Sequence, residues 1–314
     1  MTYILFAVGL VALFFGGEYL VKGASAVARR FNLSPMLIGL TIVGFGTSTP
    51  ELLVSLQAAI NEQPGIAIGN ILGSNIANIL LILGISALIA PLVIPFDRLR
   101  NDLFVMVGAS VLLGGLMWDG GLSRIEGIGM LVAMIAYIAF AIFSGSGHED
   151  EDNSPMPPQW QSWLMIVGGL VVLMFGARLL VDSAVTIASS YGISEAIIGL
   201  TIVAVGTSLP EMATSVIAAI RGQREIAVGN VVGSNIYNIL GILGVTSIVH
   251  PIAGAEMDAR FLSADMPWVV GTAIGLAILA FVFKGVPRVV GVVLLAAYAA
   301  YVWLLMTPAA VVAG

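Results

Sequence analysis

GLTIVGFGTSTPELLVS at residues 39–55 and GLTIVAVGTSLPEMATS at residues 199–215 are two stretches of this chain that are identical at 11 of 17 positions. Each stretch places one glutamate, Glu51 or Glu211, inside a long and otherwise uncharged run. A bare charge at the centre of a bilayer costs roughly 3 kcal/mol on insertion scales. Two such acids at equivalent positions therefore indicate a functional site.

The two stretches belong to a longer duplication with a constant offset of 160 residues. Of the 50 positions in Pro35–Gly84, 30 are identical to their counterparts in Glu195–Gly244. A second shared block reads AIGNILGSNIANIL at residues 67–80 and AVGNVVGSNIYNIL at residues 227–240. The chain therefore contains two copies of one unit.

The composition is that of a membrane protein. Of the 314 residues, 59% are hydrophobic and only 10% are charged, and the mean hydropathy is +1.05. Soluble domains carry about 25% charged residues, whereas an apolar run of about 20 residues crosses the hydrocarbon as a helix. We therefore predict an all-α polytopic membrane protein. The predicted transmembrane helices are 2–24, 35–60, 66–90, 102–118, 124–144, 160–184, 195–220, 226–250, 266–284 and 287–307.

Five of these helices fall in each copy, and an odd number forces the second copy to enter the membrane in the opposite orientation. The predicted architecture is therefore ten transmembrane helices in two inverted five-helix repeats, 1–144 and 160–314. Inverted repeats are typical of transporters whose site lies near the midplane. Between the repeats, GSGHEDEDNSPMPPQ at 145–159 predicts an acidic, solvated linker.

Basic residues predict the orientation of the helices. With the linker in the cytoplasm, nine Lys and Arg residues fall at cytoplasmic helix ends and three at outer ends. We therefore predict a multi-pass protein of the plasma (inner) membrane with both termini outside. Charges four residues apart near the membrane boundary are expected to pair within each copy, Glu18 with Lys22 and Arg178 with Asp182.

Each glutamate has hydroxyl-bearing neighbours three and four residues before it, on the same helix face. These predicted faces consist of Thr47, Ser48 and Glu51 in the first copy and Thr207, Ser208 and Glu211 in the second. Pro50 and Pro210 have no amide hydrogen, so carbonyl oxygens upstream of them lose their usual helical hydrogen-bond partner. Irregular backbone inside a membrane is tolerated where it lines a cavity. Each copy thus offers a carboxylate, hydroxyls and carbonyl oxygens together.

The second shared block adds neutral oxygens. In each copy a serine and an asparagine four residues apart share one helix face, Ser74 with Asn78 and Ser234 with Asn238. Four other asparagines are interpreted mainly as hydrogen-bonding links between helices, as is common for Asn in membranes. These are Asn70, Asn75, Asn230 and Asn235.

All of these candidate ligands are oxygens, which suit hard cations. Calcium takes roughly six to eight oxygens, and two carboxylates balance its charge, whereas magnesium retains its water and suits such a cage less. Sodium could use subsets of the same oxygens. Shared ligands would make the two ions mutually exclusive, which is the physical basis of exchange. The chain has no cysteine, and thiolate metal sites are therefore excluded.

The paired GTSxPE and GSNxxN blocks resemble the two alpha repeats of the sodium/calcium exchanger superfamily, most closely its compact prokaryotic branch. The resemblance implies that Ca²⁺ and Na⁺ are transported without a cofactor, and that helices one and six slide against the remaining bundle. It also implies a set of ion ligands. These are the side chains of Thr47, Ser48, Glu51, Ser74, Asn78, Thr207, Ser208, Glu211, Ser234 and Asn238, with the backbone carbonyls of Gly44 and Ala204.

One position departs from part of that superfamily. Archaeal and potassium-dependent members include proteins with Asp where this chain has Asn238. Here the site is symmetric, with Asn at both 78 and 238. The missing charge argues against a requirement for potassium.

The function expected from these patterns is a secondary antiporter that exchanges Na⁺ for Ca²⁺ by alternating access. The alternative is a proton-coupled antiporter of Ca²⁺ or another cation, and a cation channel fits an internal inverted repeat less well. An intramembrane enzyme is disfavoured, because no HExxH or GxSxG motif occurs. The expected partners are the two ions and membrane lipid, and no nucleic acid is expected.

Overall fold

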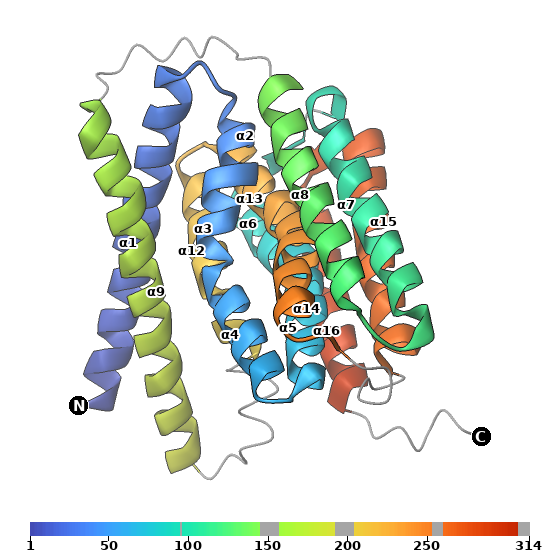
Figure 1. The fold of residues 1–314 in the computed structure, drawn as a ribbon. Helices are drawn as coiled ribbons and strands as arrows, with labels where there is room; N and C mark the ends of the chain where they lie inside the picture. The colour runs from blue at the N-terminus through green and yellow to red at the C-terminus, as the bar shows by residue number, and fades with distance from the viewer. Residues whose placement is uncertain (95, 145–156, 192–203, 253–259, 307–314) are drawn as a thin grey trace.

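The computed structural model describes residues 1–94, 96–144, 157–191, 204–252 and 260–306, and these are almost entirely helical (Figure 1). The predicted linker falls largely on 145–156, outside the described residues.

The helices of the first copy follow the predicted order, with breaks inside two of the spans. In chain order its elements are α1 (Thr2–Arg30), α2 (Pro35–Ile38), the π-helix η1 (Gly39–Val43), α3 (Gly44–Thr47), α4 (Thr49–Ile60), α5 (Pro64–Ala77), the π-helix η2 (Asn78–Ile82), α6 (Leu83–Ile89), strand β1 (Leu92–Val93), α7 (Phe96–Leu116), the 3₁₀ turn η3 (Met117–Asp119) and α8 (Arg124–Ser144).

The second copy repeats this order. Its described elements are α9 (Gln159–Ser190), α11 (Ala204–Gly206), α12 (Leu209–Ile220), α13 (Arg224–Ile236), the π-helix η5 (Tyr237–Leu243), α14 (Gly244–Val249), the π-helix η7 (Phe261–Asp265), α15 (Met266–Phe283), strand β2 (Gly285–Val286) and α16 (Arg288–Met306).

Among the described residues, eight helices are long and apolar enough to cross a membrane. A ninth span is the pair Pro35–Thr47 and Thr49–Ile60, which is bent by 44° at its break. Of the predicted span 195–220, the described part comprises α11 and the apolar helix α12. The protein is therefore a multi-pass helical membrane protein.

Four helix boundaries differ from the predicted ones by five residues or more, and one of these is the start of the helix expected at 266, which begins at Phe261 with η7. The first helix extends to Arg30 rather than residue 24, and α9 extends to Ser190 rather than 184, because helices continue past the apolar run that was used to place them. The helix expected at 102 begins at Phe96, and Asp97 in its first turn is favourable at a helix N-terminus. These extra turns carry polar residues beyond the hydrocarbon.

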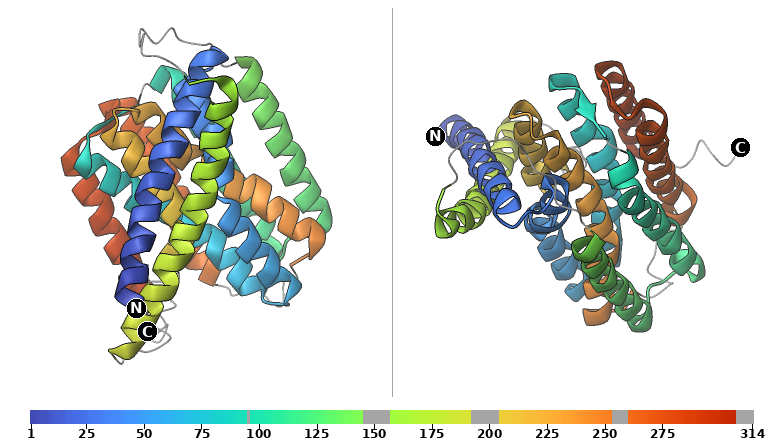
Figure 2. Two further views of the ribbon diagram at one scale, coloured as in Figure 1. Left: turned by 90° about the vertical axis from the view of Figure 1, so that its left-hand side faces the viewer. Right: turned by 90° about the horizontal axis from the view of Figure 1, so that it is seen from above.

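Helices α1 and α9 run antiparallel as a pair at one side of the bundle (Figures 1 and 2). Glycines bring them close together: a Cβ added to Gly9 would lie 3.0 Å from the carbonyl oxygen of Gly176, and one added to Gly16 would lie 3.0 Å from that of Gly169. Small residues allow this approach of two helices in a membrane. Since these two helices begin the two copies, their antiparallel course agrees with the predicted inversion.

Short backbone pairings join the copies at both ends of α7. Before α7, Leu92 of β1 pairs with Val286 of β2, and after it Leu122 forms a bridge with Ile252. Residue 252 is the counterpart of residue 92 under the offset of 160. The two pairings therefore join the copies at opposite ends of α7, and one partner of each, residue 92 or residue 252, holds the same position in its copy.

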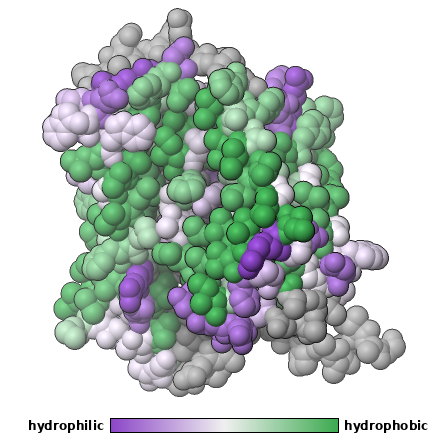
Figure 3. Space-filling model, viewed as in Figure 1, coloured by the Kyte–Doolittle hydropathy of each residue, from purple (hydrophilic) through white to green (hydrophobic). Residues whose placement is uncertain are grey.

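The interior and the surface have the polarity expected in lipid. Figure 3 shows an apolar belt over the middle of one face, with hydrophilic residues gathered mostly toward its upper and lower edges. Large apolar side chains such as Phe104, Ile135 and Phe281 are exposed. The spans α5–α6 and α13–α14 are instead largely buried at the centre, and they carry the second shared block.

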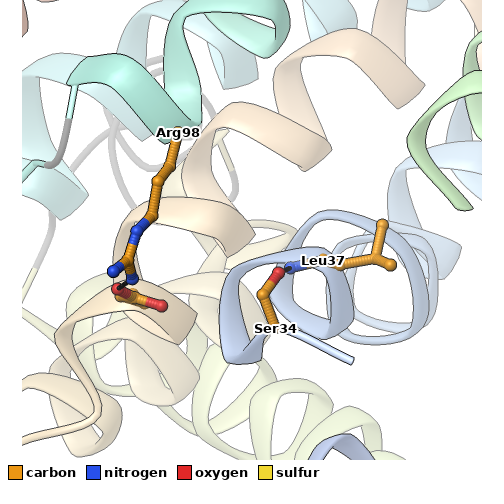
Figure 4. Close-up of polar contacts among 4 residues, drawn as sticks. Ser34, Leu37 and Arg98 are labelled. Atoms are coloured by element: carbon orange, nitrogen blue, oxygen red, sulfur yellow. Dashed lines mark hydrogen bonds and ion pairs between the residues drawn. The ribbon is translucent and has the colours of Figure 1, made fainter. Parts of the chain in front are cut away.

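Polar contacts occur at the starts of α2, α7 and α13. Ser34 caps α2 by accepting a hydrogen bond from the amide of Leu37 at 3.1 Å, which satisfies one of the amides at a helix start that have no partner in the helix. Nearby, Arg98 of α7 forms an ion pair with Glu225 of α13 at 3.0 Å (Figure 4). This pair connects the first copy to the second.

The prediction for charge pairs was right in one copy and wrong in the other. Arg178 and Asp182 form the expected pair, with 3.8 Å between Nε and Oδ2. Glu18 instead pairs with Arg221 at the end of α12, with 2.6 Å between Oε1 and Nη2. The prediction considered only neighbours on one helix, whereas the tertiary fold brings a cation from the other copy to Glu18.

Candidate ion-binding site

The two glutamates lie at equivalent helix breaks. Ser48 separates α3 from α4 and Ser208 precedes α12, and both serines leave the helical conformation with ψ near 9°. A proline follows at the start of each new helix, where its missing amide hydrogen costs nothing. Glu51 and Glu211 therefore occupy first turns, where the helix dipole stabilises negative charge.

Each carboxylate is held by a serine of the other copy. Ser48 Oγ donates to Glu211 Oε1 at 2.8 Å, and Ser208 Oγ donates to Glu51 Oε1 at 3.1 Å. Both glutamates are only 1% exposed, and neither forms an ion pair with any described residue. The half-helices of the two copies thus present two carboxylates to one buried region with no basic residue bound to them.

Ser74 joins the same cluster. Its Oγ lies 3.4 Å from Ser208 Oγ, and the side chain is buried. Its counterpart Ser234 is also fully buried, and its Oγ has no hydrogen-bond partner among the described residues. Both serines lie on the central helices, α5 and α13.

The two threonines interact with the carboxylates of the other copy, Thr47 with Glu211 and Thr207 with Glu51, and also with two asparagines. Thr47 Oγ1 donates to the carbonyl oxygen of Val43 at 3.1 Å and lies 3.2 Å from Asn230 Oδ1. Thr207 Oγ1 lies 3.5 Å from Asn70 Oδ1. The threonines therefore contact the two asparagines that brace the half-helices.

Asn70 and Asn230 have the interhelical role that the sequence indicated. Asn230 Nδ2 donates to the carbonyl oxygen of Glu211 at 3.2 Å and to Ser215 Oγ at 2.9 Å, which ties α13 to α12. Asn70 Nδ2 makes the equivalent bonds, at the same distances, to the Glu51 carbonyl and to Ser55. These bonds fix the start of each half-helix, and with it the position of each carboxylate.

Asn78 and Asn238 begin or occupy π-helical turns, η2 and η5, on the central helices. Each amide nitrogen bonds to another asparagine: Asn78 Nδ2 to Asn235 Oδ1 at 3.0 Å, and Asn238 Nδ2 to Asn75 Oδ1 at 3.1 Å. Each bond crosses from one copy to the other. Turns of this type are frequent at functional sites.

Several buried oxygen atoms of the candidate ligands have no hydrogen-bond partner within the part of the chain that the structure describes. They are Glu51 Oε2, Glu211 Oε2, Asn78 Oδ1, Asn238 Oδ1 and Ser234 Oγ. Leaving a buried acceptor unsatisfied costs about 1–3 kcal/mol, and more for a charged group. Four of the five atoms are carboxylate or amide oxygens, which only accept. The group that satisfies them must therefore be a donor or a cation.

Of the two predicted backbone ligands, the surroundings of Gly44 are described in full and those of Ala204 only in part. The carbonyl oxygen of Gly44 accepts hydrogen bonds from the amide of Ser48 at 3.1 Å and from Thr47 Oγ1 at 3.4 Å. Gly44 packs closely on the partner copy, because an added Cβ would lie 3.2 Å from the amide nitrogen of Ser234. Ala204 begins α11, and the residues before it, 192–203, lie outside the described part.

A family model described as "Sodium/calcium exchanger protein" matches residues 1–143 and 161–307. The chain belongs to the sodium/calcium exchanger family. It is therefore a membrane transporter and not an enzyme. The match covers both copies and leaves out the linker between them.

Individual relatives agree with this assignment. The chain is 38% identical to the putative antiporter CaxA of Alkalimonas amylolytica, over 96% of this chain and 97% of that protein. It is 33% identical to the sodium/calcium exchanger MaX1 of Methanosarcina acetivorans, over 96% and 97% of the two chains. A structure of the sodium–calcium exchanger NCX_Mj soaked with 10 mM Na⁺ and 10 mM Sr²⁺ superposes with a TM-score of 0.85 at 35% identity, over 98% of this chain and 99% of that one.

Asn75 and Asn235 make the interhelical hydrogen bonds that the sequence predicted, and the partner of each is a predicted ligand amide of the other copy. Their repetition in the two GSN blocks was the available signal. The contact itself could not be read from spacing, because it joins residues of different copies.

Proposed function

We propose that this exchanger carries Ca²⁺ in one direction and Na⁺ in the other through a single site built on Glu51 and Glu211. The observation that carries the proposal is the pair of buried carboxylates, each with one oxygen bonded to a serine of the other copy and one oxygen that has no hydrogen-bond partner among the described residues. Two ionised carboxylates balance the charge of one divalent cation. Two sodium ions would balance the same charge.

The surrounding oxygens suit calcium in number and type. Calcium takes roughly six to eight oxygens in a flexible geometry, and the cluster offers carboxylates, amides and hydroxyls. The proposed side-chain ligands are Thr47, Ser48, Glu51, Ser74, Asn78, Thr207, Ser208, Glu211, Ser234 and Asn238. The proposed backbone ligands are the carbonyls of Gly44 and Ala204. Sodium would occupy subsets of these oxygens, so that occupancy by one ion excludes the other.

The proposed transport cycle uses ten helices in two inverted five-helix repeats, 1–144 and 160–314. The antiparallel pairing of α1 with α9 and the equivalent bonds made by the two copies support this symmetry. Movement of α1 and α9 against the rest of the bundle would expose the site to each side in turn. The proposed location is the plasma (inner) membrane, with the linker cytoplasmic and both termini outside.

Proton coupling is the alternative that the same geometry allows. Buried carboxylates without a basic partner can bind a proton in place of a metal ion, and two such groups in one cavity titrate together. A proton-coupled exchanger would use Glu51 and Glu211 to carry Ca²⁺ and H⁺. The two functions differ in which gradient drives Ca²⁺ movement.

Calcium uptake into proteoliposomes separates the two. With the purified chain, an opposing Na⁺ gradient should drive ⁴⁵Ca²⁺ uptake at constant pH, and the uptake should saturate. In Na⁺-free vesicles, a pH gradient alone should drive little uptake. Robust uptake driven by the pH gradient, with no stimulation by Na⁺, would replace the Na⁺-coupled proposal with the proton-coupled one. Flux without any counter-ion would indicate a channel.

A further inference from the structure

An asparagine can bind a cation only through its amide oxygen. The other end of the amide carries two N–H donors, and these would repel the ion. For Asn78 and Asn238, the orientation of the amide is therefore as important as the position of the side chain. Whatever binds the nitrogen end decides this orientation.

In both copies the nitrogen end is bound by another buried asparagine. Asn235 Oδ1 accepts from Asn78 Nδ2 at 3.0 Å, and Asn75 Oδ1 accepts from Asn238 Nδ2 at 3.1 Å. All four side chains are at most 2% exposed. With the nitrogens bound in this way, the Oδ1 atoms of Asn78 and Asn238 are left without a partner among the described residues.

We propose that Asn75 and Asn235 are positioning residues of the ion site: by accepting these two hydrogen bonds, they turn the amide oxygens of Asn238 and Asn78 toward the ion. The inference rests on the proposed ion site and assigns it two further residues. Outer residues that orient metal ligands typically change metal affinity or activity by about 10- to 100-fold when they are replaced. Asn75 and Asn235 should belong to that class.

The two positioning contacts differ in how firmly they are held. Asn235 Nδ2 contacts Met106 Sδ of α7 at 3.7 Å, which fixes the orientation of Asn235 itself. The buried Nδ2 of Asn75 has no such partner in the described part of the chain. Asn78 should therefore be oriented more firmly than Asn238. Loss of Asn235 should accordingly weaken ion binding more than loss of Asn75.

A double-mutant cycle tests the inference directly, because residues that act through one another do not give additive effects. The measurement is ⁴⁵Ca²⁺ binding to the purified full chain in detergent, with half-saturating Ca²⁺ as the readout. Asn235→Ala should raise that concentration about 10-fold, and Asn75→Ala should raise it less. Adding Asn235→Ala to Asn78→Ala should change it by less than about twofold, since the amide that Asn235 orients is already gone.

A role as a structural link alone gives a different pattern. The effects of Asn235→Ala and Asn78→Ala on Ca²⁺ affinity would then multiply in the double variant, and that result would overturn the proposal. Thr272→Ala is the matched control, because this buried hydroxyl bonds within its own helix, to the Val269 carbonyl at 3.1 Å. It should leave the half-saturating Ca²⁺ concentration unchanged.

A milder variant covers the case in which the alanine variants do not fold. Met106→Leu keeps the side-chain volume, a change that cores usually tolerate, but removes the sulfur that Asn235 contacts. It should raise half-saturating Ca²⁺ about twofold with an unchanged maximal uptake rate. An unchanged affinity in this variant, if the alanine variants are unfolded, overturns the proposal.

The binding assay also separates this inference from the proposed function. The chain could bind Ca²⁺ in a way that Glu51→Gln abolishes and yet show no Na⁺-driven Ca²⁺ uptake. That result would contradict Na⁺ exchange, and the double-mutant cycle on the asparagines would still be decided by the binding measurements. Absence of Ca²⁺ binding in the unmodified chain would overturn both.

Discussion

Two regions of this exchanger differ in how closely the two copies match. We call the buried cluster around Glu51 and Glu211 the centre, and the charge pairs that involve α1, α9 and the end of α12 the rim. At the centre, Asn70 and Asn230 make the same pair of bonds in the two copies, at identical distances of 3.2 and 2.9 Å. At the rim, Glu18 pairs with Arg221 across the copies, whereas its counterpart Arg178 pairs with Asp182 of its own helix. The bonds that brace the two half-helices are therefore the same in both copies, whereas the charge pairs of the rim differ between the copies.

The strongest test of the symmetric centre removes one charge from either copy. Glu51→Gln and Glu211→Gln should each abolish Ca²⁺ uptake while leaving a folded protein, because both carboxylates are needed to balance one divalent ion. The two losses should be of similar size. Uptake in proteoliposomes gives the activity, and the thermal unfolding midpoint of the detergent-purified protein shows whether it is folded. Glu62→Gln, an exposed acid beyond the end of α4, is the matched control. Near-normal uptake in either variant would remove the central claim.

Adding a charge to the centre should also act symmetrically. Asn238→Asp and Asn78→Asp each introduce a third acid, and each should change the ratio of apparent Ca²⁺ to Na⁺ affinity by about 10-fold. The unmodified chain, with its two amides, should transport Ca²⁺ at a rate that potassium does not affect. The measurement is Na⁺-dependent Ca²⁺ uptake with K⁺ or with choline. A strict K⁺ requirement on the Ca²⁺ side would contradict the argument from Asn238.

Acid should inhibit transport through the same two carboxylates. Metal ions bind the ionised form, so protonation of Glu51 or Glu211 removes the charge that holds them, and uptake should fall as the pH falls. Because the two acids lie in one buried cluster linked by Ser48 and Ser208, the inhibition belongs to the pair. A tenfold rise in Ca²⁺ should move the midpoint about half to one pH unit lower by mass action. A midpoint that does not respond to Ca²⁺ or Na⁺ would show that the titrating groups lie elsewhere.

The smallest effect is expected at the rim. Arg221→Gln breaks the pair with Glu18, which is partly exposed, and pairs of this kind contribute about 1 kcal/mol or less. The thermal midpoint should fall by a few degrees at most, while the Ca²⁺ affinity stays unchanged. Arg178→Gln should have a smaller effect still, because both partners of its pair are strongly exposed. A large change in Ca²⁺ affinity at either position would contradict the division between centre and rim.

The duplicated blocks predicted most of the centre, because the offset of 160 identifies equivalent residues without a structure. It could not identify contacts between the copies. Spacing placed Ser48 on the face of Glu51, yet its hydroxyl bonds to Glu211. The same limit applied to Glu18, whose partner lies 203 residues away. Local periodicity describes one helix at a time, and the site lies where two half-helices meet.

Helix ends were predicted less well than helix centres. The apolar pattern located each described span, but α1 and α7 continue into polar sequence at one end. The hydropathy pattern marks only the part of a helix that crosses the hydrocarbon, whereas the helix itself continues until its backbone is capped. The breaks inside the spans were foreseen at Pro50 and Pro210. The π-helical turns η2 and η5 were not, because their sequences contain no proline.

The glycines in the contact between α1 and α9 pair in the same way as residues at the interface of a homodimer. Gly9 meets Gly176 and Gly16 meets Gly169, while the offset of 160 makes Gly9 the counterpart of Gly169 and Gly16 that of Gly176. Each glycine thus faces the counterpart of the other, as residues do across a two-fold axis between identical chains. A shorter chain with one copy could make the same contact with a second molecule of itself, provided that the two molecules entered the membrane in opposite directions. Joining them into one polypeptide fixes that pairing at synthesis and leaves each half free to change its own rim.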